Sequence, residues 1–291
     1  MTVTVIGAVN MDICGRPANA LIMRDSNPGA VTLTPGGVGR NIAHDLCLLG
    51  LDVRFIAALG DDGHADTIKK RCAALGMDMS LCLTVPGERT SSYLYITDDR
   101  GDMCVAVNDM EIAKRLTPEY LAPLMGEINL SDAVVIDANL SAETIAFIAE
   151  SCTAPLYCDP VSVTKAAKIL PVLHRLRAIK PNDIEARYMT GEDDVSLAAQ
   201  KLCELGVQRV FVSCGENGMA ACEAGHVIMQ PCRFGKVVNT TGAGDAATAA
   251  IVWADLKGFD LERTALAAQR AGAMTVACPY TNNPELSEEK I

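Results

Sequence analysis

Residues 241–250 read TGAGDAATAA and place two glycines and a carboxylate at the start of a segment rich in alanine. The threonines before this segment can cap a helix whose first free N–H groups belong to Gly242, Ala243 and Gly244. Free N–H groups and the helix dipole favour a bound anion, and glycine lets a ligand approach the backbone closely. Asp245 could accept the proton of an attacking hydroxyl there, while the amides stabilise a phosphoryl group in transfer. The alternative is that Asp245 only interacts favourably with the helix dipole.

Composition limits the classes of partner. The chain has 291 residues, 49% of them hydrophobic, which is enough for a large core. The net charge of -11 disfavours nucleic acid or an acidic membrane as an extended partner. The 12 cysteines are scattered without a C-x-x-C pair, which favours reduced thiols in the cytosol over disulfides or a metal cluster. The N-terminus has no basic leader, and no apolar run reaches the roughly 20 residues of a membrane span. We therefore expect a cytoplasmic protein that binds small molecules.

Short β-branched runs alternate with helical patterns along most of the chain. Such alternation predicts βαβ units and an α/β fold, with a mostly parallel sheet covered by helices on both faces. The predicted strands lie at 2–9, 53–60, 133–139, 154–160, 177–182 and 209–215, and the predicted helices at about 39–50, 63–76, 117–128, 141–152, 183–190 and 194–206. Ligands bind beyond the carboxyl ends of the strands in this architecture. The residues of interest that follow such ends are Asn10, Asp12, Asn139, Asp159, Asn182 and Gly215.

Two segments, 13–35 and 88–108, depart from this alternation. Both contain period-2 patterns, and DDRG at 98–101 predicts a turn. We expect them to form a small separate sheet that serves as a lid on a single domain, 1–291. The alternative is a pair of edge hairpins that extend the main sheet.

The TGAGD sequence resembles the signature of the ribokinase-like family, the phosphofructokinase-B group of sugar kinases, and further motifs match over essentially the whole chain. TPGGVGRNIA at 34–43 is similar to the family's glycine-pair motif. The resemblance implies that Gly36 and Gly37 approach the sugar and that Asn41 binds its hydroxyls. A tight turn between strand and helix is the alternative for these glycines, and Ile42 stands where a dinucleotide-binding fingerprint would have its third glycine.

The first-strand sequence VNMD, 9–12, resembles the family motif that brings Asp12 to the sugar, with Asn10 beside it. The resemblance implies a three-layer ribokinase-like fold and an ATP-dependent kinase. The transfer implied by these motifs has Asp245 as the base.

KPNDIEA at 180–186 is similar to the family's N-x-x-E motif. The resemblance implies that Asn182 and Glu185 organise Mg²⁺ through water near the phosphates, with Asp159 facing the same region. Asn182 and Glu185 also have the spacing of a helix cap and its capping-box partner, and both roles can coexist. The residues implied at the nucleotide are Asn182, Thr241 and, in the glycine turn SCGENG, Ser213, Gly215 and Gly218.

The family resemblance also bears on ions and assembly. Many members begin the catalytic motif with Asp, whereas this chain has Asn239, which puts a monovalent-cation site there in doubt. The lids of family members often pair between subunits, so a homodimer through the lid is expected.

The acceptor has to be inferred from other segments, because many hydroxylated substrates share the scaffold. Residues 25–29, 34–43, 85–94, 108–112, 159–162 with Lys165, and 280–287 together resemble those of the bacterial pseudouridine kinases, a branch of the family. That resemblance implies phosphorylation of the 5′-hydroxyl of pseudouridine. Further substrate contacts are expected from the lid residues Thr90, Ser91, Ser92 and Asn108, and from Asn139 and Lys165.

Several alternatives remain open at this level. The lid hydroxyls could be ordinary strand residues, Tyr93 and Met110 could pack on the base or only fill the lid, and Lys165 could lie along a helix instead of reaching the phosphates. Another ribonucleoside or free ribose could be the acceptor. A different class, a non-catalytic module that binds sugar or nucleotide, is the second alternative.

Overall fold

The parallel strands of the central sheet are short and mostly buried on both faces, as strands between two layers of helices must be. A computed structural model describes residues 1–232, 235 and 237–291. Within these ranges the strand order is β14-β13-β12-β11-β10-β9-β1-β4. The strands are parallel from β4 to β12, whereas β13 pairs antiparallel with both β12 and β14. The bounds are β1 (Thr2–Ile6), β4 (Asp52–Ile56), β9 (Ala133–Asp137), β10 (Leu156–Asp159), β11 (Ala178–Ile179), β12 (Arg209–Ser213), β13 (Met219–Glu223) and β14 (His226–Gln230).

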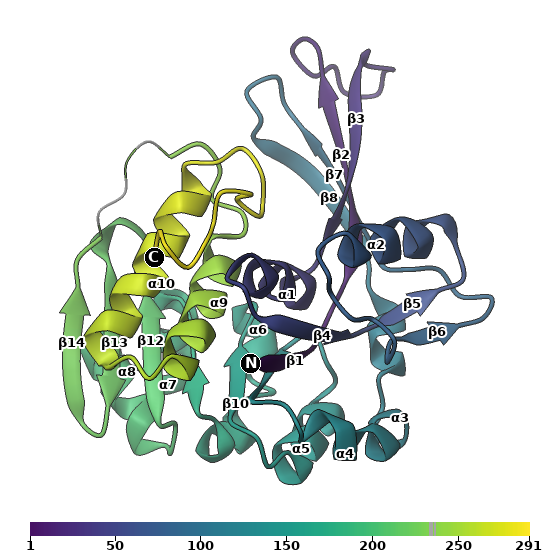
Figure 1. The fold of residues 1–291 in the computed structure, drawn as a ribbon. Coiled ribbons are helices and arrows are strands. Elements are labelled where there is room, and N and C mark those ends of the chain that lie inside the picture. The colour runs from purple at the N-terminus through teal and green to yellow at the C-terminus, as the bar shows by residue number, and fades with distance from the viewer. Residues whose placement is uncertain (233–234, 236) are drawn as a thin grey trace.

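Helices cover both faces of this sheet (Figure 1). The helices are α1 (Val38–Leu48), α2 (Gly63–Ala73), α3 (Pro118–Leu121), α4 (Met125–Ile128), α5 (Ala142–Ser151), α6 (Val163–Ala166), α7 (Asp183–Thr190), α8 (Val195–Glu204), α9 (Ala243–Leu256) and α10 (Leu261–Val276). Short 3-10 turns lie at Glu111–Arg115, Ala122–Leu124, Leu170–Arg175 and Gly215–Asn217. The predicted α/β class, with a mostly parallel sheet between helices, is confirmed.

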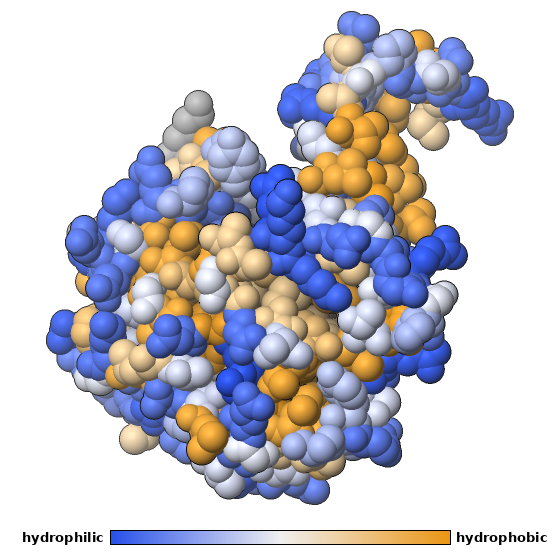
Figure 2. Space-filling model, turned by 45° about the vertical axis from the view of Figure 1, so that its right-hand side comes forward, coloured by the Kyte–Doolittle hydropathy of each residue, from blue (hydrophilic) through white to orange (hydrophobic). Residues whose placement is uncertain are grey.

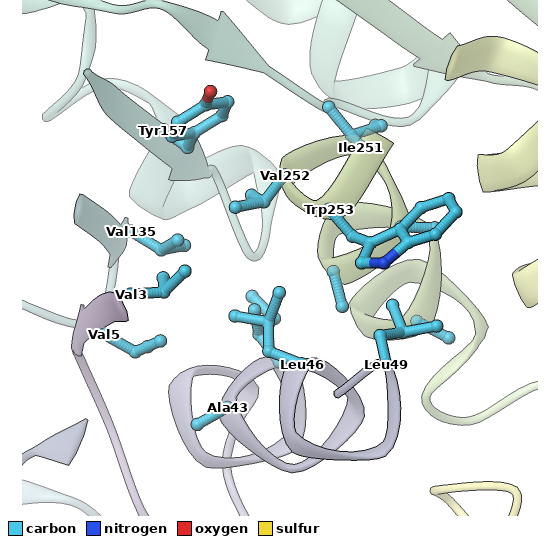
Figure 3. Packing of buried hydrophobic residues seen from close by; sticks show 14 of the residues in the cluster. Val3, Val5, Ala43, Leu46, Leu49, Val135, Tyr157, Ile251, Val252 and Trp253 are labelled. Carbon is cyan, nitrogen blue, oxygen red and sulfur yellow. The ribbon is translucent and has the colours of Figure 1, made fainter. Parts of the chain in front are cut away.

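Alternation along the strands divides the core into two halves. Val3 and Val5 of β1 join the cluster that contains α1, α9 and α10, whereas Ile6 joins the cluster that contains α5 and α8. Figure 3 shows the first half, where the valines of the sheet face Leu46 of α1 and Val252 of α9. Both α1 and α9 are therefore fixed against the sheet by apolar burial, and their first turns are held in place at its edge.

A four-stranded sheet projects from the body (Figure 1). Its order is β3-β2-β7-β8, and it is separate from the main sheet. The bounds are β2 (Asn10–Pro17), β3 (Gly29–Gly36), β7 (Ser92–Thr97) and β8 (Met103–Asp109), and a two-stranded sheet pairs β5 (Ala58–Gly60) with β6 (Leu83–Val85). Both segments 13–35 and 88–108 thus contribute strands to the projecting sheet. Whether it closes over a ligand as a lid stays a prediction.

The projecting sheet has two chemically different faces. Cross-strand register places Thr34, Asp12, Tyr93 and Asn108 side by side on what we call the polar face. The opposite, apolar face carries Leu33, Ile13, Leu94 and Val107 in one row, and Leu33, Leu94 and Val107 are 49%, 43% and 64% exposed. Figure 2 shows apolar surface gathered on the stem of this sheet.

None of the helices within residues 1–232 and 237–291 combines the length and the apolar character that crossing a bilayer requires.

Candidate active site

The carboxyl ends of β9, β10 and β11 meet the first turns of α1 and α9 at one edge of the main sheet. Asp137, the last residue of β9, accepts hydrogen bonds from Gly39 N of α1 at 2.8 Å and from Ala8 N, after β1, at 2.9 Å. Asp159, the last residue of β10, accepts from the Thr248 hydroxyl of α9 at 2.9 Å. Buried carboxylates thus tie both helix starts to the strand ends, as the topology of parallel sheets predicts for a ligand site.

Helix α9 begins at the TGAGD sequence. Gly242 is the N-cap residue with φ of 85°, and a Cβ there would overlap the carbonyl oxygen of Thr281. Only glycine fits this left-handed position beside the C-terminal segment. Ala243 and Gly244 follow in the first turn, where backbone N–H groups have no intrahelical acceptor. The geometry required for anion binding at this end of α9 is therefore present.

Asp245 lies in that first turn and is only 9% exposed. Its Oδ2 accepts a hydrogen bond of 2.8 Å from Nδ2 of Asn41. Burial raises the pKa of Asp245 to about 7, and the nearby Asp159 carboxylate adds to the increase, while Asn41 and Lys180 oppose it. A carboxylate whose pKa lies near neutrality can take up and release a proton at working pH.

Lys180 is a further member of the site that the sequence analysis did not single out. It is 6% exposed, and its Nζ lies 3.6 Å from Oδ2 of Asp159. The same nitrogen lies 3.4 Å from the position that a Cβ on Gly244 would occupy. A buried cation therefore lies directly beside the first turn of α9. Its position just before Pro181 and Asn182, in the N-x-x-E motif, was the available signal.

Asn182 and Glu185 form the predicted capping box of α7. Asn182 Oδ1 accepts from Glu185 N at 2.8 Å, and Glu185 Oε2 accepts from Asn182 N at 2.9 Å. Burial raises the pKa of the Glu185 carboxyl, and the charge of Asp159 acts in the same direction. The capping role is thus present, and it leaves the Glu185 carboxylate near Asp159 and Lys180.

This donor set fits Mg²⁺ held mainly by water and phosphate. Across the described ranges no group of three or more His, Cys, Asp and Glu side chains has the arrangement of a metal cage. Mg²⁺ commonly takes one or two carboxylates together with water and substrate phosphates. The buried carboxylates of Asp159 and Glu185 could supply these ligands beside the anion-binding turn.

The residues expected to hold a sugar lie on β2, at the end of β3 and at the start of α1. Asn10 Nδ2 donates to Asp12 Oδ1 at 2.6 Å, and Asp12 occupies the space that a side chain on Gly36 would need. Gly37 has φ of 98°, and a Cβ there would lie 2.6 Å from the Ala8 carbonyl oxygen. Both glycines are therefore required by close packing around Asp12 and the start of α1. Burial raises the pKa of Asp12, although the Asn10 hydrogen bond opposes this.

Asp137 was also missed in the sequence. Its carboxylate fills the space that side chains on Gly7 and Gly39 would need, and it accepts the N–H of Asn139 at 2.8 Å. Asn139 Oδ1 in turn accepts a short hydrogen bond from the Lys165 ammonium. Asn139 and Lys165 are thus brought together, and a role of either one at the substrate stays a prediction.

The strand register places the residues predicted to belong to a lid on different faces of the projecting sheet. Asn108 is exposed and lies on the polar face with Asp12. Ser92 pairs with Met11 and therefore lies on the opposite face, where its hydroxyl donates to the Thr90 carbonyl at 3.3 Å. The structure does not bring Ser92 to the side of the sheet that carries Asp12.

Thr90 belongs to the base of the projecting sheet. Its hydroxyl donates to Asp62 Oδ1 at 2.7 Å and accepts from Gly60 N at 3.0 Å. Thr90 and Ser91 are both 2% exposed. The Thr90 hydroxyl is therefore occupied within the protein.

The predicted nucleotide residues lie around the ends of β12 and α7. Ser213 bridges to Asn182 in a parallel pair, next to the capping box. A Cβ on Gly218 would overlap the carbonyl of Gln230, so this glycine is required by the turn itself. Gly215 has open space where its side chain would be, with φ of 53°. Thr241 is exposed at the start of α9.

Comparison with known proteins agrees with this geometry. The profile of the pfkB family carbohydrate kinases matches residues 2–288. Pseudouridine kinase of Escherichia coli (strain K12) is 37% identical, with 98% of this chain and 93% of that protein covered. A second protein of this strain, named an uncharacterized sugar kinase, is 31% identical over 98% of this chain and 81% of its own length.

Solved structures agree as well. A carbohydrate kinase from Agrobacterium tumefaciens superposes with a TM-score of 0.89 at 27% identity, covering 99% of this chain and 95% of that one. The predicted ribokinase-like fold is therefore confirmed, and so is the predicted class of enzyme, a phosphotransferase with an alcohol acceptor. The chain belongs to the pfkB family of carbohydrate kinases.

Proposed function

We propose that this kinase transfers the γ-phosphate of ATP to the 5′-hydroxyl of pseudouridine. The observation that carries the transfer step is the buried pair of Asn41 and Asp245, joined at 2.8 Å at the anion-binding end of α9. The choice of acceptor is supported by the 37% identity to a pseudouridine kinase over nearly the whole chain.

Asp12, Asn10 and Asn41 would hold the ribose. Asp12 and Asn41 come from β2 and α1, and Arg40 connects them, because its charge acts on Asp12 while its guanidinium donates to Asn41 Oδ1 at 2.8 Å. A sugar between them could direct one hydroxyl at Asp245. Gly36 leaves room for the Asp12 carboxylate, and Gly37 leaves room for the backbone of Ala8. Asp245 would then accept the 5′-hydroxyl proton as the oxygen attacks phosphorus.

The backbone N–H groups of residues 242–244 would receive the negative charge that develops on the transferring phosphoryl group. Lys180 would add a positive charge beside Gly244. Bound Mg²⁺ would neutralise phosphate charge, with Glu185, Asp159 and Asn182 as its ligands, directly or through water. Ser213, Gly215 and Gly218, which lie around the end of β12, and Thr241, which precedes α9, are proposed to contact the nucleotide. Lys165 and Asn139 are proposed to contact the substrate.

The polar face of the projecting sheet supports a nucleoside over a free sugar. Tyr93 lies directly opposite Asp12 in the register, with Asn108 on its other side. The rings of Tyr93 and Tyr95 are 5.5 Å apart. An aromatic surface next to the ribose-binding carboxylate is suited to a base attached to that ribose. Asn108 can donate to base carbonyls and accept from base N–H groups.

The apolar face of the same sheet supports a homodimer. Leu33, Leu94 and Val107 lie in one cross-strand row and are each more than two-fifths exposed. An apolar row of this kind on the stem of a projecting sheet marks an interaction surface (Figure 2). We propose a second copy of the chain as the occupant, so that two lids support each other.

A monovalent cation is not required at the start of the catalytic motif in this proposal. Asn239 Oδ1 accepts from Thr241 N at 3.0 Å, and its Nδ2 donates to the Pro279 carbonyl at 3.4 Å. An aspartate at position 239 would place a negative charge next to the Pro279 carbonyl oxygen, whereas the Asn239 amide donates a hydrogen bond to that oxygen. Turnover should therefore be unchanged when K⁺ is replaced by tetramethylammonium.

The test is ADP release from MgATP by the purified protein with pseudouridine, uridine, adenosine, ribose or no acceptor, with Asp245→Asn as the matched variant. Turnover selective for pseudouridine and lost in the variant is expected. Turnover with adenosine or ribose instead would keep the transfer mechanism and reject the acceptor. Normal turnover by Asp245→Asn would reject Asp245 as the base.

A further inference from the structure

A chain of buried hydrogen bonds connects Asp245 to the C-terminal segment. Asn41 donates to Asp245, Arg40 Nη1 donates to Asn41 Oδ1 at 2.8 Å, and the same nitrogen donates to Asn282 Oδ1 at 2.8 Å. Asn282 Nδ2 donates to the Asn41 carbonyl at 3.1 Å and to Asp45 Oδ1 at 2.9 Å. The four side chains of Arg40, Asn41, Asp45 and Asn282 are all less than one tenth exposed.

The direction of each hydrogen bond in this chain is determined by Arg40. A guanidinium can only donate, so the groups that receive its N–H bonds must be the amide oxygens of Asn41 and Asn282. With its oxygen held by Arg40, Asn41 must present its NH₂ group to Asp245. The oxygen of Asn282 is fixed in the same way, which leaves its NH₂ group for Asp45 and for the backbone of α1.

Without Arg40, only the contact with the ionised Asp245 carboxylate orients the Asn41 amide, and protonation of Asp245 would let the amide turn over. Its oxygen would then face the Asp245 carboxylate, and two acceptors would repel each other. A hydrogen bond donated to the ionised carboxylate favours the charged form, and losing it favours the protonated form. The orientation of Asn41 therefore decides how readily Asp245 ionises.

Asn282 holds Arg40 in place from a part of the chain distant in sequence. Nε of Arg40 has no hydrogen-bond partner among the residues that the structure describes, so Asn41 and Asn282 accept the side-chain hydrogen bonds of Arg40, while the Asp45 charge and the Cys72 thiol lie near its guanidinium. The preceding residue, Thr281, places its carbonyl against Gly242 at the start of α9. Residues 281 and 282 thus contact the anion-binding turn and the sugar-binding helix together.

We propose that Arg40 and Asn282 are positioning residues for the transfer reaction, because their hydrogen bonds keep an N–H donor of Asn41 directed at Asp245. This inference rests on the proposed role of Asp245 as the base. Neither residue needs to touch the reacting atoms.

The expected readout is the acid limb of the pH profile of kcat/KM for the nucleoside. Asn282→Leu and Arg40→Met should move this limb upward by about one pH unit, with most of the activity recovered near pH 9. Arg40→Lys keeps a donor and should restore part of the shift. The other charged groups around Asp245 are Asp137, Asp159, Lys180, Asp45 and Arg40 itself, and only Arg40 is changed by these variants.

Asn283→Leu is the matched control. Asn283 is the next residue and donates to the Met274 carbonyl at 2.7 Å, outside this hydrogen-bond chain. The Asn283→Leu variant should leave the acid limb of the pH profile at the wild-type pH, even if the substitution lowers the melting temperature. Arg40→Met is also expected to raise the KM of the nucleoside, because Arg40 acts on Asp12, whereas Asn282→Leu is not.

Two outcomes would overturn the inference. One is a loss of kcat/KM by the same factor at all pH values, and the other is an acid limb that stays at the wild-type pH in variants that fold. If Arg40→Met does not fold, Asn282→Leu alone decides, because it removes the acceptor that holds the guanidinium. An active Asp245→Asn enzyme would instead reject the proposed function, so the two failures can be told apart.

Discussion

Lys180 holds its ammonium group 3.6 Å from Oδ2 of Asp159, with both side chains less than one tenth exposed. This ion pair lies directly beside Gly244 in the first turn of α9. The chain as a whole carries a net charge of -11, and Asp245 and Glu185 add negative charge to the site. Lys180 is thus a buried cation beside the first turn of α9 that can make this region attractive to a polyphosphate.

Lys180→Met should therefore impair the use of ATP. We expect kcat/KM for ATP to fall about 100-fold, in the range seen for the loss of one charged group at a phosphoryl-transfer site. Asp159 would also lose its partner, so thermal unfolding should be followed in parallel. Lys201→Met, an exposed lysine in α8, is the control. Unchanged ATP kinetics in a folded Lys180→Met protein would contradict the role.

The pH dependence of the wild-type enzyme follows from Asp245. Its pKa is raised to about 7, mainly by burial, and only its ionised form can accept a proton. We expect kcat/KM for the nucleoside to rise with pH, to reach half of its maximum near pH 7 and to level off above. A profile that is flat between about pH 5 and pH 9 would show that no group of this kind limits the reaction.

The same carboxylate should cost stability. Between the unfolded pKa of about 4 and the folded pKa of about 7, the native state holds a proton that the unfolded state releases, so stability falls as pH rises. Asp245→Asn removes this cost and should raise the free energy of unfolding by up to about 4 kcal/mol near pH 8, with little change near pH 4. Urea unfolding at the two pH values measures the difference. An equal change in the free energy of unfolding at both pH values would mean that the substitution acts through packing and not through the ionisation of Asp245.

Much of the fold could be predicted because its signals are local. Alternating apolar runs and helical patterns indicate parallel strands between helices, and the spacing of Asn182 and Glu185 indicates the capping box that the structure contains. The TGAGD sequence likewise contains all the residues that form its turn.

The missed residues depend on contacts between distant parts of the chain. Asn282 lies 241 positions from the Asn41 carbonyl that it binds, and Asp137 lies 98 positions from Gly39. Neither separation leaves a periodic pattern in the sequence. The face on which Ser92 lies could not be predicted for a different reason. It depends on the strand register, and a shift of one residue in the register exchanges the two faces of a sheet.

The proposed dimer predicts a variant that separates assembly from folding. Val107→Glu introduces a charge into the apolar face, where Val107 is 64% exposed and a glutamate can be solvated in the isolated chain. We expect a shift from dimer to monomer in sedimentation or light scattering, with an unchanged melting temperature at low concentration. Leu130→Glu makes the same kind of change at a residue that is 83% exposed just after α4, and it is the control for the added charge. A monomeric wild-type protein would reject the dimer outright.

The aromatic part of the polar face predicts discrimination between nucleoside and sugar. Tyr93 lies next to Asp12 in the register, so a base attached to the bound ribose can pack on its ring. Tyr93→Leu should raise the KM for pseudouridine about tenfold, equivalent to roughly 1.4 kcal/mol, with little effect on the weaker activity toward ribose. Tyr93→Phe keeps the ring and should retain most of the affinity. If Tyr93→Leu raises the KM for ribose and for pseudouridine by the same factor, the Tyr93 side chain supports the sheet and does not contact the base.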